Sequence, residues 1–433
     1  MFKKLGCLVL PLILLAQEPK QKTVGVGGQD DVDAGGDFRL WDGMVNQTRV
    51  HLRDLGIAPY DVIPAGQSAI TSLTVHRNGQ VYGGTTGEVA NLFVFSPGHN
   101  IVFPLGTIPG EPSIYHSLVA GHDGQIYFGT SLNVDKEYYP DENLVKGTDW
   151  YYRSVRIQME KDFAGYAGGH IYRYNPASTQ INFLQKNFRI DKPCPVTDLG
   201  IPVPHEGIYT LLLDRKLDVI YGISYPGANL FRFDIKSGKS EVIARLNRVT
   251  PREEYRPLIS KALVQDEKGN IYANTDGGNL VMFSPETGRV ETVGVRLPGM
   301  SGRERINGIQ AAVLHPGGEI YGGATDGYLF SYSPETRQIR NLGKPLMDTE
   351  IRALSVGLDG RIYGLGGRLG GVTRLFVYDV DDHSYRDLGM LEVSVVPYYE
   401  WKALHFDSMV TARDGSLFLG NSEHRSRLFI YNP

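Results

Sequence analysis

Three features of the sequence predict an all-β fold. A four-strand pattern recurs seven times, the last copy stops one strand short, and a strand-like segment precedes the first copy. The 433 residues also include 52 glycines and 25 tyrosines in short alternating runs, which favour strands over helices. Together they predict a seven-bladed β-propeller of four-stranded antiparallel blades, closed by an N-terminal strand that completes the last blade.

The first two strands of each blade are predicted by a polar turn followed by a short apolar run. Asn-Gly, Asp-Gly and Gly-Gly steps suit hairpin turns, and the flanking residues alternate as half-buried strands do. The seven copies read RNGQVYGG, HDGQIYFG, LDVIYGIS, KGNIYANT, GGEIYGGA, DGRIYGLG and DGSLFLGN.

The third strand of each blade follows as Leu-Phe-x-Tyr or a close variant, and a more polar fourth strand such as RQIRNLGKPL comes next. Four strands in roughly 40 to 55 residues is the size of a propeller blade. The chain ends at RLFIYNP, after a third strand, whereas TRVHLRDLG at 48–56 resembles a fourth strand. We therefore expect the N-terminal strand to close the ring and remove two exposed sheet edges. An open β-solenoid would leave this displaced strand unexplained.

The repeat predicts a single domain from residue 38 to 433. Residues 1–16 carry two lysines and an apolar run too short to span a bilayer, which is typical of a secretion signal, and residues 17–37 are expected to form a flexible mature N-terminus. We expect a secreted or periplasmic monomer with no stable membrane insertion. Beyond the signal the only thiol is Cys194, so no internal disulfide is expected. The net charge of −4, without a basic stripe, argues against a nucleic-acid partner.

Superposing the copies on their turn glycine brings one polar position per blade into register on the innermost strand. Because innermost strands line the channel of a propeller, these side chains are expected to converge there. The column consists of Thr71, His116, Thr210, Lys261, Gln310, Arg352 and Asp407. A second ring, at the start of the third strands and on the same face, consists of Asn91, His170, Asn229, Asn279, Tyr328, Arg374 and Arg427. His116 and His170, from one blade, should therefore look toward a common depression.

The same blade carries the one large insertion, residues 132–167, between its second and third strands. Long loops on a rigid scaffold often carry function. Trp150 and Tyr151 are candidate substrate-binding residues in this insertion, because aromatic rings stack on the C–H faces of sugars beside a polar cleft.

These residue types suit the removal of a proton beside a carboxylate, as in β-elimination from a uronic acid of an acidic polysaccharide or oligosaccharide. His116 and His170 are the candidate catalytic base and its partner, and Tyr209 can transfer a proton on the other side. The carboxylate must be neutralised, and the candidate substrate-binding cations are Lys261, Arg352 and Arg374.

Other interpretations stay open. The two histidines can simply line the channel, and the cations can pair with Asp407 and loop acids. A glycoside hydrolase needs paired carboxylates; the two rings contain just Asp407, although Asp276, Asp326 and Glu423 lie on loops of the same face. A non-catalytic propeller would instead bind a glycan or a protein at its rim.

No cofactor is expected and no metal ligand is assigned, because no cysteine or clustered carboxylate completes a ligand set around the histidines. A structural metal in the channel stays open. His76, His122 and His315 fall in the hairpin turns, on the opposite face, and are expected to be solvated turn residues.

At these positions the chain resembles the seven-bladed propeller polysaccharide lyases, namely the ulvan lyases and the related rhamnose-glucuronate lyases. These carry a histidine on an inner strand, a second on the following third strand, and a tyrosine and an arginine from the next blade. The resemblance implies a lyase site at His116 in IYHSLVAGHDG, His170 in GGHIYRYNP and Tyr209 in GIYTLLLD. The arginine of the family has no counterpart in YGISYPGANLFR, where Arg232 lies three residues too far along. The chain is also similar to propeller α-L-rhamnosidases, which implies hydrolysis of rhamnosyl-glucuronic acid glycans as the alternative.

Overall fold

The computed structural model describes residues 49–56, 69–134, 149–178, 181, 192–247, 259–303, 307–347, 350–367, 372–393, 405–422 and 426–433. The predictions for residues 1–16 and 17–37 lie outside the described residues. So do Glu423 and the side chains of Trp150 and Tyr151.

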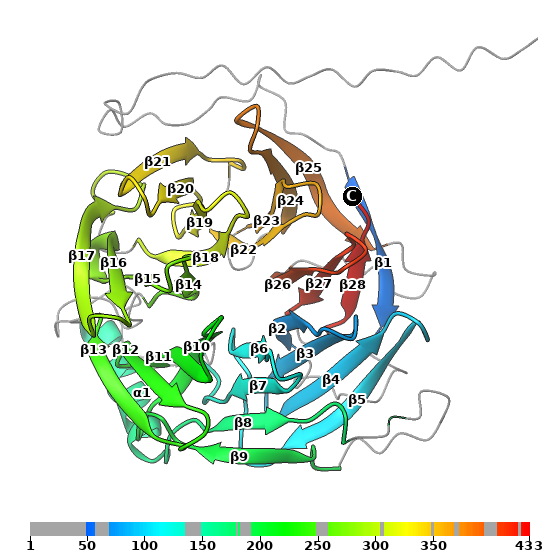
Figure 1. Ribbon diagram of the computed structural model, residues 1–433, viewed down its shortest axis with the longest axis vertical. Coiled ribbons are helices and arrows are strands. Elements are labelled where there is room, and N and C mark those ends of the chain that lie inside the picture. The colour runs from blue at the N-terminus through cyan, green and yellow to red at the C-terminus, as the bar shows by residue number, and fades with distance from the viewer. Residues whose placement is uncertain are drawn as a thin grey trace, which may run out of the picture.

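The strands form seven four-stranded antiparallel blades arranged in a ring, which confirms the predicted propeller (Figure 1). Blade one comprises β2 Ala69–Val75, β3 Val81–Thr86, β4 Ala90–Ser96 and β5 Ile101–Ile108, and blade two comprises β6 Leu118–Ala120, β7 Ile126–Gly129, β8 Ile171–Tyr174 and β9 Val196–Gly200. Blade three comprises β10 Gly207–Leu213, β11 Val219–Tyr225, β12 Asn229–Asp234 and β13 Ser240–Arg245, and blade four comprises β14 Val264–Gln265, β15 Ile271–Asn274, β16 Asn279–Ser284 and β17 Arg289–Arg296. Blade five comprises β18 Ile309–Leu314, β19 Ile320–Ala324, β20 Leu329–Ser333 and β21 Gln338–Gly343. Blade six comprises β22 Ile351–Val356, β23 Ile362–Gly366, β24 Arg374–Asp379 and β25 Ser384–Val393. Blade seven comprises β26 Phe406–Thr411, β27 Leu417–Asn421, β28 Leu428–Tyr431 and β1 Arg49–Gly56. A short 3₁₀ helix, η2 Asp276–Gly278, precedes β16.

The N-terminal strand β1 completes blade seven, as predicted. It pairs antiparallel with β28, with Asp54 opposite Phe429. The first half of β1 also pairs in parallel with β25 of blade six, with Arg49 opposite Met390. The closing strand therefore joins blades six and seven into one eight-stranded sheet, a link that the repeat pattern does not predict.

The core lies between the blades. The described residues contain seven hydrophobic clusters, each of which joins neighbouring blades; the cluster between blades three and four also includes Tyr115 of blade two and residues of the insertion. The recurring glycines after the second-strand tyrosine make this packing possible. A Cβ on Gly83 would lie 2.1 Å from the ring of Phe93 in the same blade, and a Cβ on Gly84 would lie 2.5 Å from Ile114 of the next blade. Because neither space admits a methyl group, the repeated glycines follow from close packing within and between blades.

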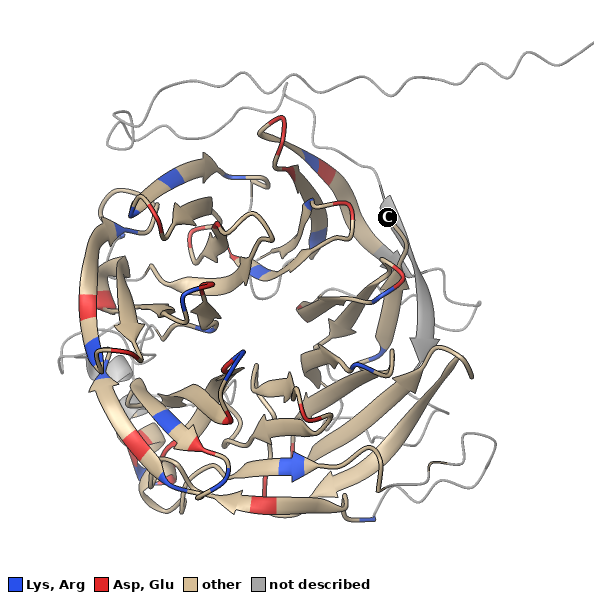
Figure 2. Cartoon of the chain, in the orientation of Figure 1, with Lys and Arg blue, Asp and Glu red and all other residues tan. Residues whose placement is uncertain are grey.

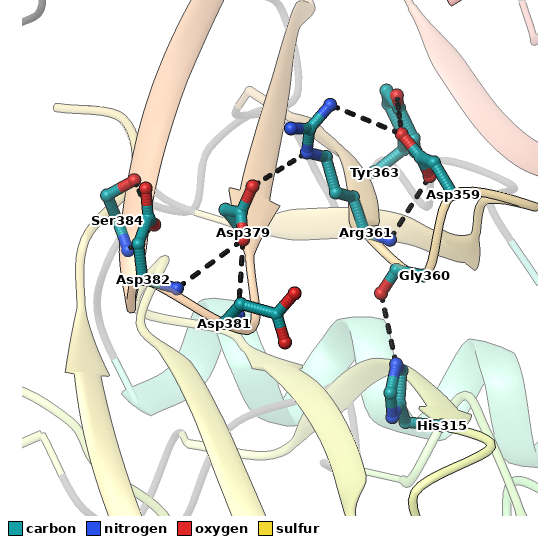
Figure 3. A network of polar contacts seen from close by, with 9 residues as sticks. All are labelled: His315, Asp359, Gly360, Arg361, Tyr363, Asp379, Asp381, Asp382 and Ser384. Atoms are coloured by element: carbon teal, nitrogen blue, oxygen red, sulfur yellow. Dashed lines mark hydrogen bonds and ion pairs between the residues drawn. The ribbon is translucent and has the colours of Figure 1, made fainter.

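Hairpin turns between the first and second strands connect neighbouring blades at one face of the ring. Figure 3 shows one such turn, where Nε2–H of His315 in blade five donates to the carbonyl of Gly360 in blade six at 3.0 Å. The side chain of Asp359 shapes this turn by accepting hydrogen bonds from the backbone of Arg361 and the hydroxyl of Tyr363.

The prediction that the turn histidines are merely solvated is wrong for His76, which is buried. A ring nitrogen of His76 donates to the carbonyl of Gly124 in blade two, and one of His122 donates to the carbonyl of Asp214 in blade three. These histidines therefore hold neighbouring blades together, and sequence position alone concealed that role because the acceptors are main-chain atoms.

The insertion in blade two contains a helix, α1 Asp149–Ala164, which lies behind blade three in the view of Figure 1. Its Met159 and Phe163, one helical turn apart, are buried against the cluster shared by blades three and four. The hydroxyl of Tyr225 donates to the sulfur of Met159 at 3.3 Å. Half of the helix residues are polar, and the apolar Ile157 is exposed, so the apolar positions do not form one buried stripe, which explains why the sequence suggested a loop. In the described part of the chain, no helix combines the length and apolar character needed to cross a membrane.

Candidate functional site

The polar column of the innermost strands coincides with a repeated backbone irregularity. In five blades the pairing of the first two strands shifts register around one extra residue, a β-bulge, and the bulged residues are Thr71, Tyr209, Gln310, Arg352 and Asp407. In blades two and four the inner strands are shorter. There Val119 pairs with Tyr127 and Val264 pairs with Tyr272, and the residues three positions before these valines, His116 and Lys261, occupy the position that is bulged in the other blades.

The predicted column is wrong in blade three, where it contained Thr210. Thr210 pairs regularly with Ile223, and the bulge falls on Tyr209. The turn between β10 and β11 is one residue longer than in blade one, which shifted the register counted from the turn. The corrected column contains a histidine and a tyrosine at equivalent positions of adjacent blades.

Four members of the column form a central cluster: His116, Lys261, Arg352 and Asp407. Arg352 donates through Nε and Nη2 to Oδ1 of Asp407 at 2.7 and 2.6 Å, and both side chains are buried. Burial alone would raise the pKa of Asp407, but Arg352 and Lys261 hold it well below its usual value. The backbone amide of Lys261 donates to the carbonyl of Ile309, but its ammonium group forms no hydrogen bond or ion pair within the described part of the chain, so it is the uncommitted cation of this cluster.

His116 has an unusual position in the central cluster. Its backbone φ is +28°, a left-handed conformation that is uncommon outside glycine. The imidazole is half-buried, and its Nε2 is enclosed without a hydrogen-bond partner among the described residues. Burial, followed by the charges of Lys261 and Arg352, lowers the pKa of His116 to about 3. The ring is therefore neutral near neutral pH and is a weak base, but it can accept or donate a hydrogen bond.

His170 lies at the start of the third strand of the same blade and makes a different set of contacts. Its Nδ1 is 2.9 Å from Oδ2 of Asp198 on the fourth strand, and its side chain is 25% exposed. The ring stacks on Tyr172 with centroids 5.6 Å apart. The backbone is fixed by Thr130, whose hydroxyl accepts from the amide of His170 and whose amide donates to the carbonyl of His170.

The strand pairing relates the two histidines. Gly129 donates to the carbonyl of Ser117, and Thr130 donates to the carbonyl of His170, so His116, Thr130 and His170 occupy one row across the blade. Two strand spacings separate the histidine backbones by about 10 Å. No described contact joins the two imidazoles, which belong to separate polar clusters at the same end of blade two.

A second carboxyl group lies close to His170. Glu111, from the connection between blades one and two, is buried and accepts a hydrogen bond from the hydroxyl of Tyr166 at 2.6 Å. Burial raises the pKa of Glu111, and the charges of both His170 and Asp198 act on it. Burial and the neighbouring Glu111 raise the pKa of Tyr166 as well. We call Glu111, Tyr166, His170 and Asp198 the blade-two cluster.

The remaining predicted residues lie in different surroundings. Tyr209 is buried and packs against Tyr115 and Tyr225, with ring centroids 5.0 and 5.5 Å away, beneath the insertion helix. Arg374 donates twice to Oδ2 of Asp387, at 2.9 and 2.6 Å, and is therefore occupied by a carboxylate, as Arg352 is.

Charged side chains are distributed around the whole ring (Figure 2). Figure 2 shows Lys and Arg interspersed with Asp and Glu around the blades, without a uniformly basic region in this view. Within the described ranges, no group of three or more His, Cys, Asp or Glu side chains is arranged to hold a metal ion.

Sequence reasoning missed Asp198 and Glu111. Asp198 belongs to an Asp-Leu-Gly step that recurs at 387–389 and 54–56, so it resembled part of the repeated framework. Glu111 lies in a connection that has no counterpart in the pattern. The signal for Asp198 lies in the pairing of the third and fourth strands. Asp198 lies opposite Tyr172, which places Asp198 beside His170, two residues before Tyr172.

A scan of family models and a search of curated proteins give no match to the chain. Solved structures do match. A streptogramin B lyase has a TM-score of 0.57 at 11% identity, covering 88% of this chain and 97% of that one. An oligogalacturonate lyase in complex with manganese has a TM-score of 0.52 at 11% identity, covering 89% and 98%. An extracellular domain of a hybrid two-component system from B. thetaiotaomicron has a TM-score of 0.54 at 15% identity, covering 89% of this chain and 40% of that one. At such identities the likeness concerns the fold, and the chain is a seven-bladed β-propeller.

Proposed function

We propose that this propeller is a polysaccharide lyase that cleaves a uronic-acid-containing glycan by β-elimination. The observation that carries the proposal is the arrangement of His170. Its imidazole is partly exposed, is held by a carboxylate and lies in the same row as His116. Lys261 lies near His116, and its ammonium group has no carboxylate bonded to it among the described residues.

The proposed reaction needs a base, an acid and a cation. His170 removes the proton from the carbon beside the carboxylate, forming N–H as C–H breaks. The electron pair of that C–H bond becomes a C=C bond while the neighbouring C–O bond of the glycosidic link breaks. Tyr209 gives its proton to the departing oxygen, so that the products are a new chain end and an unsaturated uronate.

The cation is Lys261. Neutralising the carboxylate makes the adjacent proton easier to remove. His116 assists as a neutral hydrogen-bonding group, since its low pKa makes it a poor base. Arg352 and Asp407 form an ion pair that contributes to the electrostatic potential of the channel. Arg374 is bonded to Asp387, so only the part of its guanidinium group that this pair leaves exposed can bind substrate. The role of Trp150 and Tyr151 in binding neighbouring sugars stays a prediction from the sequence, because their side chains lie outside the described residues.

The neighbours of known structure support the proposal in part. Two of them are named as lyases, and one of these is named for oligogalacturonate, an oligomer of a uronic acid. Another is an extracellular domain, which agrees with the secretion signal expected at the N-terminus and with an extracellular polysaccharide as substrate.

The test is ultraviolet absorbance of the protein incubated with a panel of uronate polysaccharides that includes ulvan and gum arabic. A rising signal from the conjugated double bond is expected for the wild type. It should fall at least 100-fold in His170→Ala, because loss of a general base removes about 10²- to 10⁴-fold of the rate. His99→Ala is the matched control, since His99 is exposed in a turn between β4 and β5.

The other outcomes would assign the protein to a different functional class. A flat absorbance trace with release of reducing sugar would replace elimination by hydrolysis. A flat trace with measurable glycan binding and no product would make the propeller a binding module.

Hydrolysis is the second candidate because of Glu111. A buried carboxyl group with a raised pKa is suited to act as a general acid, and the carboxylate of Asp198 lies close enough to influence it. In that case Glu111→Gln abolishes release of rhamnose from rhamnosyl-glucuronic acid glycans, while His170→Ala only weakens it.

A further inference from the structure

The fourth strands of several blades contain an Asx-Leu-Gly step that forms a local bulge. In blade two, Oδ1 of Asp198 accepts the amide of Gly200 at 2.9 Å. In blade six, Oδ1 of Asp387 accepts the amide of Gly389 at 2.8 Å. The strand pairing skips a residue at both places, so the side-chain oxygen satisfies an amide that the sheet leaves unpaired.

Blade five shows that this backbone role needs no charge. There the equivalent residue is Asn341, whose amide oxygen accepts from Gly343 at 2.8 Å in the same kind of bulge. Asparagine therefore stabilises the bulge as aspartate does. The negative charge of Asp198 must be explained by its other oxygen, Oδ2, which bonds His170.

A carboxylate accepts hydrogen bonds and cannot donate them. Nδ1 of His170 must therefore carry the proton in its contact with Asp198, and the lone pair of the neutral ring resides on Nε2. The carboxylate is itself fixed by Gly200, the ring stacks on Tyr172, and Thr130 fixes the backbone. The imidazole is thus held in one tautomer and one orientation.

We infer that Asp198 is a positioning residue that fixes the Nδ1–H tautomer of His170 and so makes Nε2 available as the base. The catalytic part of this inference rests on the proposed function, whereas the tautomer does not. The titratable groups facing the pair are Glu111, Tyr166 and Tyr172; burial raises the pKa of Tyr172 to about 12, so it stays uncharged beside the ring.

The informative variant is Asp198→Asn. Its amide oxygen is expected to bond Gly200, as that of Asn341 bonds Gly343, which leaves the NH₂ group facing Nδ1 of His170. An NH₂ group can only donate, so Nδ1 must become the acceptor and the proton must move to Nε2. The variant keeps the fold and reverses the tautomer.

The measurement is long-range ¹H–¹⁵N NMR of the full chain labelled at histidine, with the signals of His170 identified by their loss in His170→Ala. We expect a protonated Nδ1 in the wild type and in Asp387→Asn, which makes the same substitution in the matching bulge of blade six. We expect a protonated Nε2 in Asp198→Asn. On a cleaved polysaccharide, Asp198→Asn should lower kcat about 100-fold or more with KM little changed.

Two results would overturn the inference. One is a wild-type His170 protonated at Nε2, or a tautomer that is the same in Asp198→Asn. The other is a reversed tautomer with an unchanged kcat, which would reduce Asp198 to a structural partner. If no uronate glycan is cleaved by the wild type, the proposed function fails and the NMR result still decides whether Asp198 sets the tautomer.

Discussion

The two faces of the ring use polar side chains in different ways. At the face with the hairpin turns, His76, His122 and His315 each bond a main-chain carbonyl of the next blade, and for His76 and His315 the acceptor is the equivalent turn glycine. At the face with the bulges, equivalent positions hold different residues in every blade, and their contacts differ as well. Thr71 and Gln310 bond neutral groups, Arg352 and Asp407 pair as charges, and Nε2 of His116 has no hydrogen-bond partner among the described residues. Repeated polar contacts build the ring, and polar residues that differ between equivalent positions mark the candidate site.

The largest expected effect tests whether the bulge face also contains structural polar contacts. Asp407→Ala leaves Arg352 buried without its carboxylate, and removal of one partner of a buried ion pair costs about 3–5 kcal/mol. Urea unfolding should show this loss of unfolding free energy. Asp218→Ala, which removes an exposed ion pair with Lys236, should leave the midpoint unchanged. A loss as small as that of the control would mean that Arg352 is solvated rather than held by Asp407.

An intermediate effect concerns pH. The pKa of folded His116 is about 3, below the usual value near 6.5, so between these values the unfolded chain binds more protons than the folded one. Stability from this group is fully present above pH 6.5 and is lost as the pH falls toward 3, by up to about 1.4 kcal/mol per pH unit. His116→Gln should therefore show a shallower dependence of unfolding free energy on pH between 6.5 and 4. Identical slopes in the two proteins would show that the histidine is not enclosed.

The smallest effect sharpens the contrast between the faces directly. His76→Ala removes a buried contact between blades one and two and should lower the unfolding free energy by about 1 kcal/mol, with product formation unchanged. His170→Ala should do the reverse, with catalysis lost and stability retained. If His76→Ala abolished turnover instead, the division of roles between the faces would be wrong.

The sequence allowed the fold to be predicted in detail because its physical causes repeat. Glycines such as Gly83 and Gly84 recur where neighbouring side chains leave no space for a Cβ, and turn chemistry recurs beside them. The site was predicted less completely. One extra residue in the turn before β11 moved the column from Tyr209 to Thr210, and Asp198 was hidden because its Asp-Leu-Gly step also serves the backbone. Glu111 lies in a connection where no periodicity assigns an orientation.

The strand β1 has a consequence for the order in which the protein assembles. Its antiparallel partner β28 lies at the other end of the repeat, so a ribosome must deliver almost the whole ring before Asp54 can pair with Phe429. Closing so long a loop costs only modestly more entropy than closing a shorter one, but it makes this pairing a late event. Until then β25 is the only described strand of the earlier blades to which β1 can pair. We expect a nascent chain to hold its first strand in parallel register beside blade six before blade seven completes the circle.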